Sequence, residues 1–303
     1  MIFMKLKLIL SLALTMFTCL NIQAQNAHSN IIDEAFADLR GQVLMTFDRG
    51  DTAKVWNIAD GKLLVTFSKN STEWNTKLLR YKINHPDYTL SGSSTEITKD
   101  ARGVWSSIYT LNNQVVGIHK PGKGRISWNL PSRKAVEFDA GNNTTIINAI
   151  TFPAAGSEDK NVTAKILVKL PYYSYPEFSP KGTWLFGSYP GELIHPETGV
   201  VTEIPADIKM LTNQVAQYAF SADESLLAVS TENGIAIIET ATAKLVKEIK
   251  IPKKIKEKEG YTIYPLSDMQ SFVYTGGRYD WSGKGDTKKA WLVKESGAIE
   301  LVD

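Results

Sequence analysis

The chain contains a repeat of about 40 residues, which constrains the fold more than any other feature of the sequence. A segment that begins Phe178-Ser-Pro-Lys-Gly-Thr returns 42 residues later as Phe220-Ser-Ala-Asp-Glu-Ser. Two strand-like runs joined by a turn follow each copy, at 191–204 and at 234–249. A period near 40 with four short strands per unit is typical of a β-propeller blade. We therefore expect an all-β chain closed into a ring of blades.

The recurring strand–turn–strand pattern sets the expected number of blades. It lies at 51–67, 125–138, 193–204, 235–249 and 290–302. The intervals 76–103 and 145–170 are irregular, and each has room for one further blade. We predict seven four-stranded blades of about 40 residues, with six as the alternative. Gly61 and Gly199 are expected in turns with positive φ. Residues 31–37 either start the first blade or complete the last one.

The first repeat resembles the WD40 repeat family. The run Asp51-Thr-Ala-Lys-Val-Trp follows the family pattern, with Asn57 where the family usually has Asp. In that family an Asp, a Ser or Thr of the second strand and the Trp share a hydrogen-bond network. The resemblance implies that Asp51, Thr46 and Trp56 form it here, and that Trp128 takes the place of Trp56 in another blade. The family's Gly-His before the first strand is absent, so we expect the network to be incomplete.

The first 24 residues have the pattern of a secretory signal peptide. Two lysines precede an apolar run at 8–20, and Ala24 offers a cleavage site. The run is too short to span a bilayer. Lipid attachment at Cys19 is disfavoured because Thr18, directly before it, is not one of the small residues that such sites normally have. We predict a periplasmic or secreted protein in which residues 25–303 form one propeller domain without a transmembrane segment.

The charge balance argues against a nucleic-acid partner. The chain has 34 basic and 32 acidic side chains, and loss of the two signal-peptide lysines leaves 32 of each. Nucleic acids and anionic membranes require a basic surface. The only cysteine lies in the signal peptide, so no disulfide stabilises the mature chain. We expect a monomer whose partner is another protein or an extracellular or periplasmic ligand.

Two segments are candidates for binding. The loop 275–287, between the second and third strands of the last blade, is rich in glycine and carries Arg278, Tyr279, Asp280 and Trp281. Aromatic and arginine side chains on a loop are typical contact residues. The alternative is a simple connection whose tryptophan folds back on the rim. Tyr175, in the aromatic run at 171–176, either points into the central channel or packs between blades.

The sequence contains no motif that predicts catalysis or a cofactor. There is no His-Glu-x-x-His, no Gly-x-Ser-x-Gly and no cysteine nucleophile in the mature chain. We therefore favour a non-enzymatic scaffold or ligand-recognition propeller. The alternative is a lactonase-like hydrolase with a metal in the central channel. Its ligands would come from residues such as Glu34, Asn84, Asn148 and Glu177, which no spacing selects.

Overall fold

The computed structural model is built of antiparallel β-sheets. It describes residues 27–28, 32–38, 41–48, 50, 52–68, 94–99, 101, 105–111, 114–119, 125–129, 132, 134–141, 144–154, 156–211, 217–256, 261–276 and 289–302. Across these ranges every regular element is a strand, and there are 23 of them. The prediction of an all-β chain is therefore confirmed.

The strands form six sheets, which we number in chain order. Sheet 1 comprises β1 (Ile32–Ala37), β2 (Val43–Asp48), β3 (Thr52–Asn57) and β4 (Leu63–Ser68), and sheet 2 comprises β5 (Ser94–Lys99), β6 (Trp105–Leu111) and β7 (Gln114–His119). Sheet 3 comprises β8 (Arg125–Asn129), β9 (Lys134–Gly141), β10 (Thr144–Thr151) and β11 (Thr163–Leu170). Sheet 4 comprises β12 (Pro176–Phe178), β13 (Leu185–Gly187), β14 (Glu192–Ile194) and β15 (Val201–Glu203). Sheet 5 comprises β16 (Tyr218–Phe220), β17 (Leu226–Thr231), β18 (Gly234–Glu239) and β19 (Leu245–Lys250), and sheet 6 comprises β20 (Tyr261–Pro265), β21 (Ser271–Gly276), β22 (Ala290–Lys294) and β23 (Gly297–Leu301).

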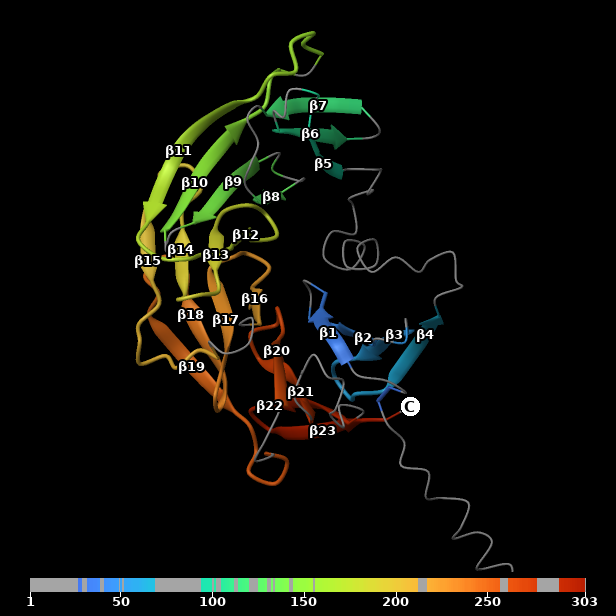
Figure 1. Ribbon diagram of the computed structural model, residues 1–303. Helices are drawn as coiled ribbons and strands as arrows, with labels where there is room; N and C mark the ends of the chain where they lie inside the picture. The colour runs from blue at the N-terminus through green and yellow to red at the C-terminus, as the bar shows by residue number, and fades with distance from the viewer. Residues whose placement is uncertain are drawn as a thin grey trace, which may run out of the picture.

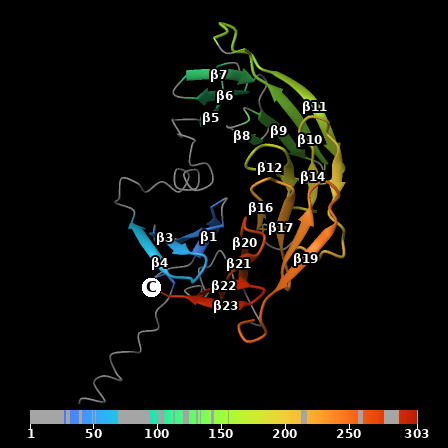
Figure 2. The same ribbon diagram turned by 180° about the vertical axis from the view of Figure 1, so that it is seen from behind.

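The sheets are arranged as the blades of a propeller. Within each sheet the strands pair in chain order. Sheets 2 to 6 follow one another along an arc, and sheet 1 lies beside sheet 6 (Figures 1 and 2). The first strands β12, β16 and β20 lie toward the middle of the arc, whereas the last strands β11, β15, β19 and β23 form its outer rim (Figure 1).

Apolar residues on both faces of the strands explain this arrangement. In β17, Leu227 and Val229 pack with Phe186 of sheet 4, whereas Ala228, between them, packs in a cluster with Phe272 of sheet 6. Successive side chains of a strand point to opposite faces, so a strand that is apolar throughout needs a neighbour on both sides. Further apolar clusters join sheets 2 and 3, sheets 3 and 4, and sheets 6 and 1.

The described residues form six sheets, which is the alternative count rather than the predicted seven. The sequence pattern assigned the hairpin at 125–138 to the end of one blade and 145–170 to another, but β8 to β11 pair in a single sheet. The hairpin at 125–138 resembles the one at 51–67 in sequence because an asparagine closes each turn. Asn57 Oδ1 accepts a hydrogen bond from the Ala59 amide at 2.8 Å, and Asn129 Oδ1 accepts one from the Ser132 amide at 2.9 Å. The likeness therefore marks a type of turn and not a strand position.

The structure also decides the role of residues 31–37. β1 pairs with β2 in sheet 1. It contacts sheet 6 through side chains and through hydrogen bonds from the Tyr264 hydroxyl to the Ile32 carbonyl at 3.1 Å and from the Ser267 hydroxyl to the Ala37 carbonyl at 3.5 Å. It therefore starts the first blade. No helix within the described ranges has the length and apolar character that crossing a bilayer requires.

Candidate functional site

Each four-stranded sheet has two ends, which carry different turns. Since the strands alternate in direction, the first and third turns of a sheet lie at one end, which we call the hairpin end. The second turn and the segment that leads into the first strand lie at the other end, which we call the linker end. Both ends of the propeller carry features that are suited to binding.

At the linker end of sheet 1, a buried hydrogen-bond network holds the blade together. The Trp56 indole nitrogen donates to Thr46 Oγ1 at 2.8 Å, and His28 Nε2 lies 2.7 Å from the same oxygen. His28 Nδ1 lies 3.0 Å from Asp48 Oδ2. All four side chains are buried.

This network differs from the one expected from the sequence. The structure brings Thr46 and Trp56 together, but Asp48 is the aspartate of the network, and Asp51 lies outside the described residues. The expectation of an incomplete network is wrong, because Ala27-His28 supplies the histidine without the preceding glycine. Trp128 lies on β8, the first strand of sheet 3, and its side chain is outside the described part.

At the linker end of sheet 4, three tyrosines face solvent. Tyr173 and Tyr175 precede β12, and Tyr189 lies in the β13–β14 turn. Their exposed fractions are 39%, 45% and 56%. We call these three residues the tyrosine patch. Tyr175 also contacts Phe138 of sheet 3 edge-on, with 5.9 Å between ring centroids, so its ring has a fixed support.

A buried polar cluster lies beneath this patch. Thr145 Oγ1 accepts a hydrogen bond from the Ser174 amide at 2.8 Å and donates to the Tyr172 carbonyl at 2.8 Å. The Ser174 hydroxyl donates to the Glu192 carboxyl. That carboxyl lies against Gly187, where any side chain would collide with it. The segment that carries the patch is therefore tied to the strands of sheets 3 and 4.

The Glu192 carboxyl is the most perturbed acid of the cluster. The residue is fully buried, and burial raises its pKa from 4.5 to about 7 despite the opposing hydrogen bonds from Ser174 and Gly191. Burial, with the nearby Glu192 and Glu203 carboxylates, also raises the pKa of Tyr172 to about 12. Near neutral pH the Glu192 carboxyl changes between its protonated and charged forms.

The residues proposed as ligands of a central metal lie on different kinds of strand. Glu34 and Glu177 are on the first strands β1 and β12, whereas Asn148 is on the third strand of sheet 3. Glu177 accepts a hydrogen bond from the Tyr218 hydroxyl of β16 at 2.6 Å. Asn84 lies outside the described residues. Within the described part of the chain, no group of three or more His, Cys, Asp or Glu is placed to hold a metal ion.

The predicted binding loop is anchored in sheet 6. It connects β21 to β22, the second and third strands, as expected from the sequence. Its two attachment points therefore lie at the linker end, the same end as the tyrosine patch. Arg278, Tyr279, Asp280 and Trp281 themselves lie outside the described residues.

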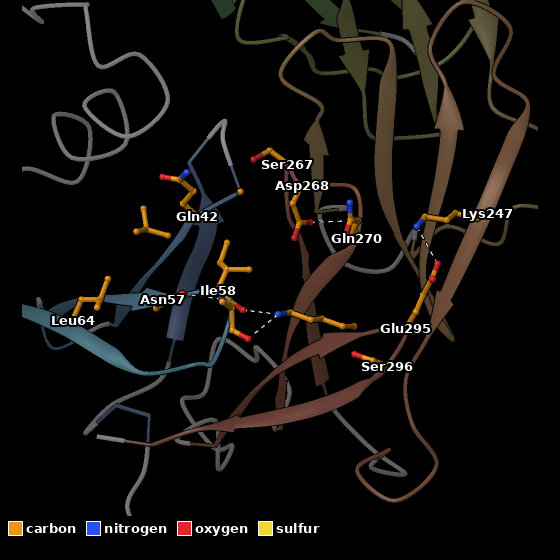
Figure 3. Close-up of a pocket in the computed structure, with 14 residues that line it drawn as sticks. Gln42, Asn57, Ile58, Leu64, Lys247, Ser267, Asp268, Gln270, Glu295 and Ser296 are labelled. Carbon is orange, nitrogen blue, oxygen red and sulfur yellow. Dashed lines mark hydrogen bonds and ion pairs between the residues drawn. The ribbon is translucent and has the colours of Figure 1, made fainter.

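The hairpin end carries a groove of about 1110 Å³ where sheets 1 and 6 meet (Figure 3). The β1–β2 and β3–β4 turns of sheet 1 and the β20–β21 and β22–β23 turns of sheet 6 line it, together with Leu64 and Lys247. In Figure 3, Gln42 and Leu64 lie on the sheet 1 side, and Lys247 and Glu295 lie on the far side. Nothing in the sequence pattern pointed to this groove, because its walls come from segments more than 200 residues apart.

Sequence reasoning also missed two parts of the linker end. His28 has a detectable signal, a histidine a few residues before the first strand. Glu192 has no sequence signal, because an acid at the start of a short strand is normally exposed. Only the packing of sheet 4 buries Glu192.

Comparisons with known proteins give similarity at the level of fold. No protein-family model and no curated protein matches the chain. Among solved structures, Hsv2 of Kluyveromyces lactis has a TM-score of 0.42 at 11% identity, over 88% of this chain and 75% of that one. Hsv2 of Kluyveromyces marxianus has a TM-score of 0.40 at 10% identity, over 88% and 77%. A KlHsv2 variant with loop 6CD replaced by a Gly-Ser linker has a TM-score of 0.40 at 11% identity, over 88% and 78%.

Proposed function

We propose that this protein is an exported, non-enzymatic propeller whose linker end binds another protein or an extracellular or periplasmic ligand. The tyrosine patch is the observation that carries this proposal. Tyrosine offers a large apolar ring with one polar atom and loses little conformational freedom on binding, so it is enriched at interfaces. Three exposed tyrosines at one end of a single sheet are therefore more typical of a contact surface than of a solvated loop end.

The support beneath the patch favours recognition. Tyr175 rests on Phe138, and the preceding Ser174 is hydrogen-bonded to Thr145 and Glu192. A contact surface whose side chains are already held in place loses less entropy when a partner binds. The loop with Arg278, Tyr279, Asp280 and Trp281 leaves sheet 6 at the same end, and we include it in the proposed site.

The binding proposal is tested with paired variants of the mature protein. Tyr175→Ala together with Tyr189→Ala removes most of the patch, and Val200→Ala changes an equally exposed residue at the hairpin end of the same sheet. Partners are cross-linked in the native host and quantified by mass spectrometry. We expect at least one partner to fall by about tenfold in the patch variant and to be retained in the Val200 variant. Equal recovery of every partner from both variants contradicts the proposal.

The loop, the absence of a cofactor and export are tested separately. Alanine at Arg278, Tyr279 and Trp281 together is expected to weaken binding of the same partner.

Elemental analysis of the purified protein is expected to find no stoichiometric divalent ion, and a bound ion at one per chain would instead favour the hydrolase alternative. N-terminal sequencing of the protein from the periplasmic or extracellular fraction is expected to begin at Gln25. Recovery of the uncleaved chain from the cytoplasm would contradict export.

A further inference from the structure

The groove at the hairpin end is distinct from the linker-end site, and we propose that it is a second binding site that takes an extended, uncharged segment of a partner polypeptide. The two sites lie at opposite ends of the sheets, so they can be occupied at the same time. The inference goes beyond the proposed function, because it makes the propeller a scaffold that bridges two partners.

The walls of the groove are held together in the absence of a partner. The Lys294 ammonium donates to the Ile58 carbonyl at 2.6 Å and to the Ala59 carbonyl at 3.3 Å, which joins the turns of sheets 6 and 1. Ser267 Oγ donates to the Asp38 carbonyl at 2.9 Å across the same boundary. A preformed groove loses little conformational entropy when a partner binds.

The charges of the groove are already balanced. Lys247 and Glu295 form an ion pair at 3.0 Å. The Asp268 carboxyl accepts hydrogen bonds from the Gln270 and Ser271 amides, each at 3.0 Å. Among the described residues that line the groove, the two lysines balance the two acids. Phosphates, nucleic acids and strongly charged peptides therefore gain little there.

The remaining lining matches the chemistry of a peptide chain. Gln42, Gln270 and Ser296 are exposed and offer neutral donors and acceptors, and Leu64 is 55% exposed at one side. Amides and hydroxyls pair well with backbone amides, and Leu64 offers a contact for one aliphatic side chain. No aromatic residue is among the described residues that line the groove, so a stacking platform for a sugar ring is missing there. The groove's volume of about 1110 Å³ is at the upper limit of the usual range for small-ligand pockets, roughly 300–1,000 Å³.

A displayed library of random peptides of about 12 residues, which includes extended binders, tests the inference on the full mature chain. Enriched peptides are synthesised, and their Kd is measured by fluorescence anisotropy at low and high salt. We expect an uncharged consensus with one aliphatic residue. Its Kd is expected to change less than about twofold with salt, since exposed charge pairs are the interactions that salt screens.

Matched variants locate the bound peptide. Leu64→Ser with Gln270→Ala is expected to weaken binding by about tenfold, because it removes two direct contacts, and Ser296→Trp is expected to block binding sterically. Ile166→Ser is the control, because Ile166 is 52% exposed on the outer strand of another sheet. Circular dichroism and the melting temperature establish that each variant is folded, and Gln42→Ala replaces any variant that is not.

Several outcomes overturn the inference. They are the absence of any enriched peptide, binding that is unchanged in all the groove variants, and a charged consensus with strong salt dependence. Self-association that only the groove variants abolish would identify a second copy of this chain as the occupant. Peptides that are lost in the Tyr175→Ala, Tyr189→Ala variant but not in the groove variants would place binding at the linker end alone. That last result refutes the inference and leaves the proposed function intact.

Discussion

Replacing Glu192 with glutamine is expected to remove a pH dependence of stability. Burial raises the pKa of this carboxyl from 4.5 to about 7, so the folded state holds its proton more tightly than the unfolded state does. The stability that this proton contributes is fully present below pH 4.5 and is lost as the pH rises to 7 and beyond. Each pKa unit corresponds to about 1.4 kcal/mol, so the whole effect is about 3 kcal/mol. That is a large part of the roughly 5–15 kcal/mol of a typical domain.

The assay is urea denaturation of the wild type and of Glu192→Gln at pH 5 and pH 8. Glutamine resembles the protonated carboxyl, and its carbonyl still accepts the Ser174 hydroxyl. We expect the variant to gain about 2–3 kcal/mol relative to the wild type between pH 5 and pH 8. Glu158→Gln changes an exposed acid of a loop, and its difference from the wild type is expected to be the same at both pH values. A constant difference for Glu192→Gln would show that the carboxyl reaches solvent and would refute the reasoning.

Three further predictions concern stability. Trp56→Ala is expected to lower the free energy of unfolding by about 3–5 kcal/mol, because it removes a fully buried ring and a hydrogen bond to Thr46, and an unchanged melting curve would contradict this. Gly61 and Gly199 both have positive φ, as expected from the sequence, at +72° and +71°. Alanine is expected to lower the free energy of unfolding more at Gly199 than at Gly61. A Cβ would lie 2.4 Å from a backbone oxygen at Gly199 but would meet only a side-chain methyl, at 2.8 Å, at Gly61. Calorimetry that reverses this order would disprove the steric argument. Glu224 is buried and accepts hydrogen bonds from the β12–β13 turn of the neighbouring sheet 4. Glu224→Ala is therefore expected to lower the free energy of unfolding, measured by denaturant titration, by about 2–4 kcal/mol. A loss below about 0.5 kcal/mol would mean that water replaces these bonds.

Local physical chemistry explains what the sequence alone determined. The unbroken apolar runs at 226–229 and 235–238 predict strands that are covered on both faces, and a period near 40 predicts propeller blades. Turn chemistry is equally local, since Asn57 and Gly61 specify a tight turn wherever the strand lies in its sheet. For the same reason the sequence could not say that Trp128 is on a first strand and Trp56 on a third.

The tertiary structure decided everything that depends on contact between distant segments. It selected β8 to β11 as one sheet, and it placed His28 next to Thr46 and Asp48. It buried Glu192 beneath the tyrosine patch, and it brought the turns at 41–43 and 267–270 together to form the groove. Burial, a shifted pKa and the shape of a binding surface are properties of packing between sheets. No pattern within a single repeat records them, because each repeat contributes only one wall.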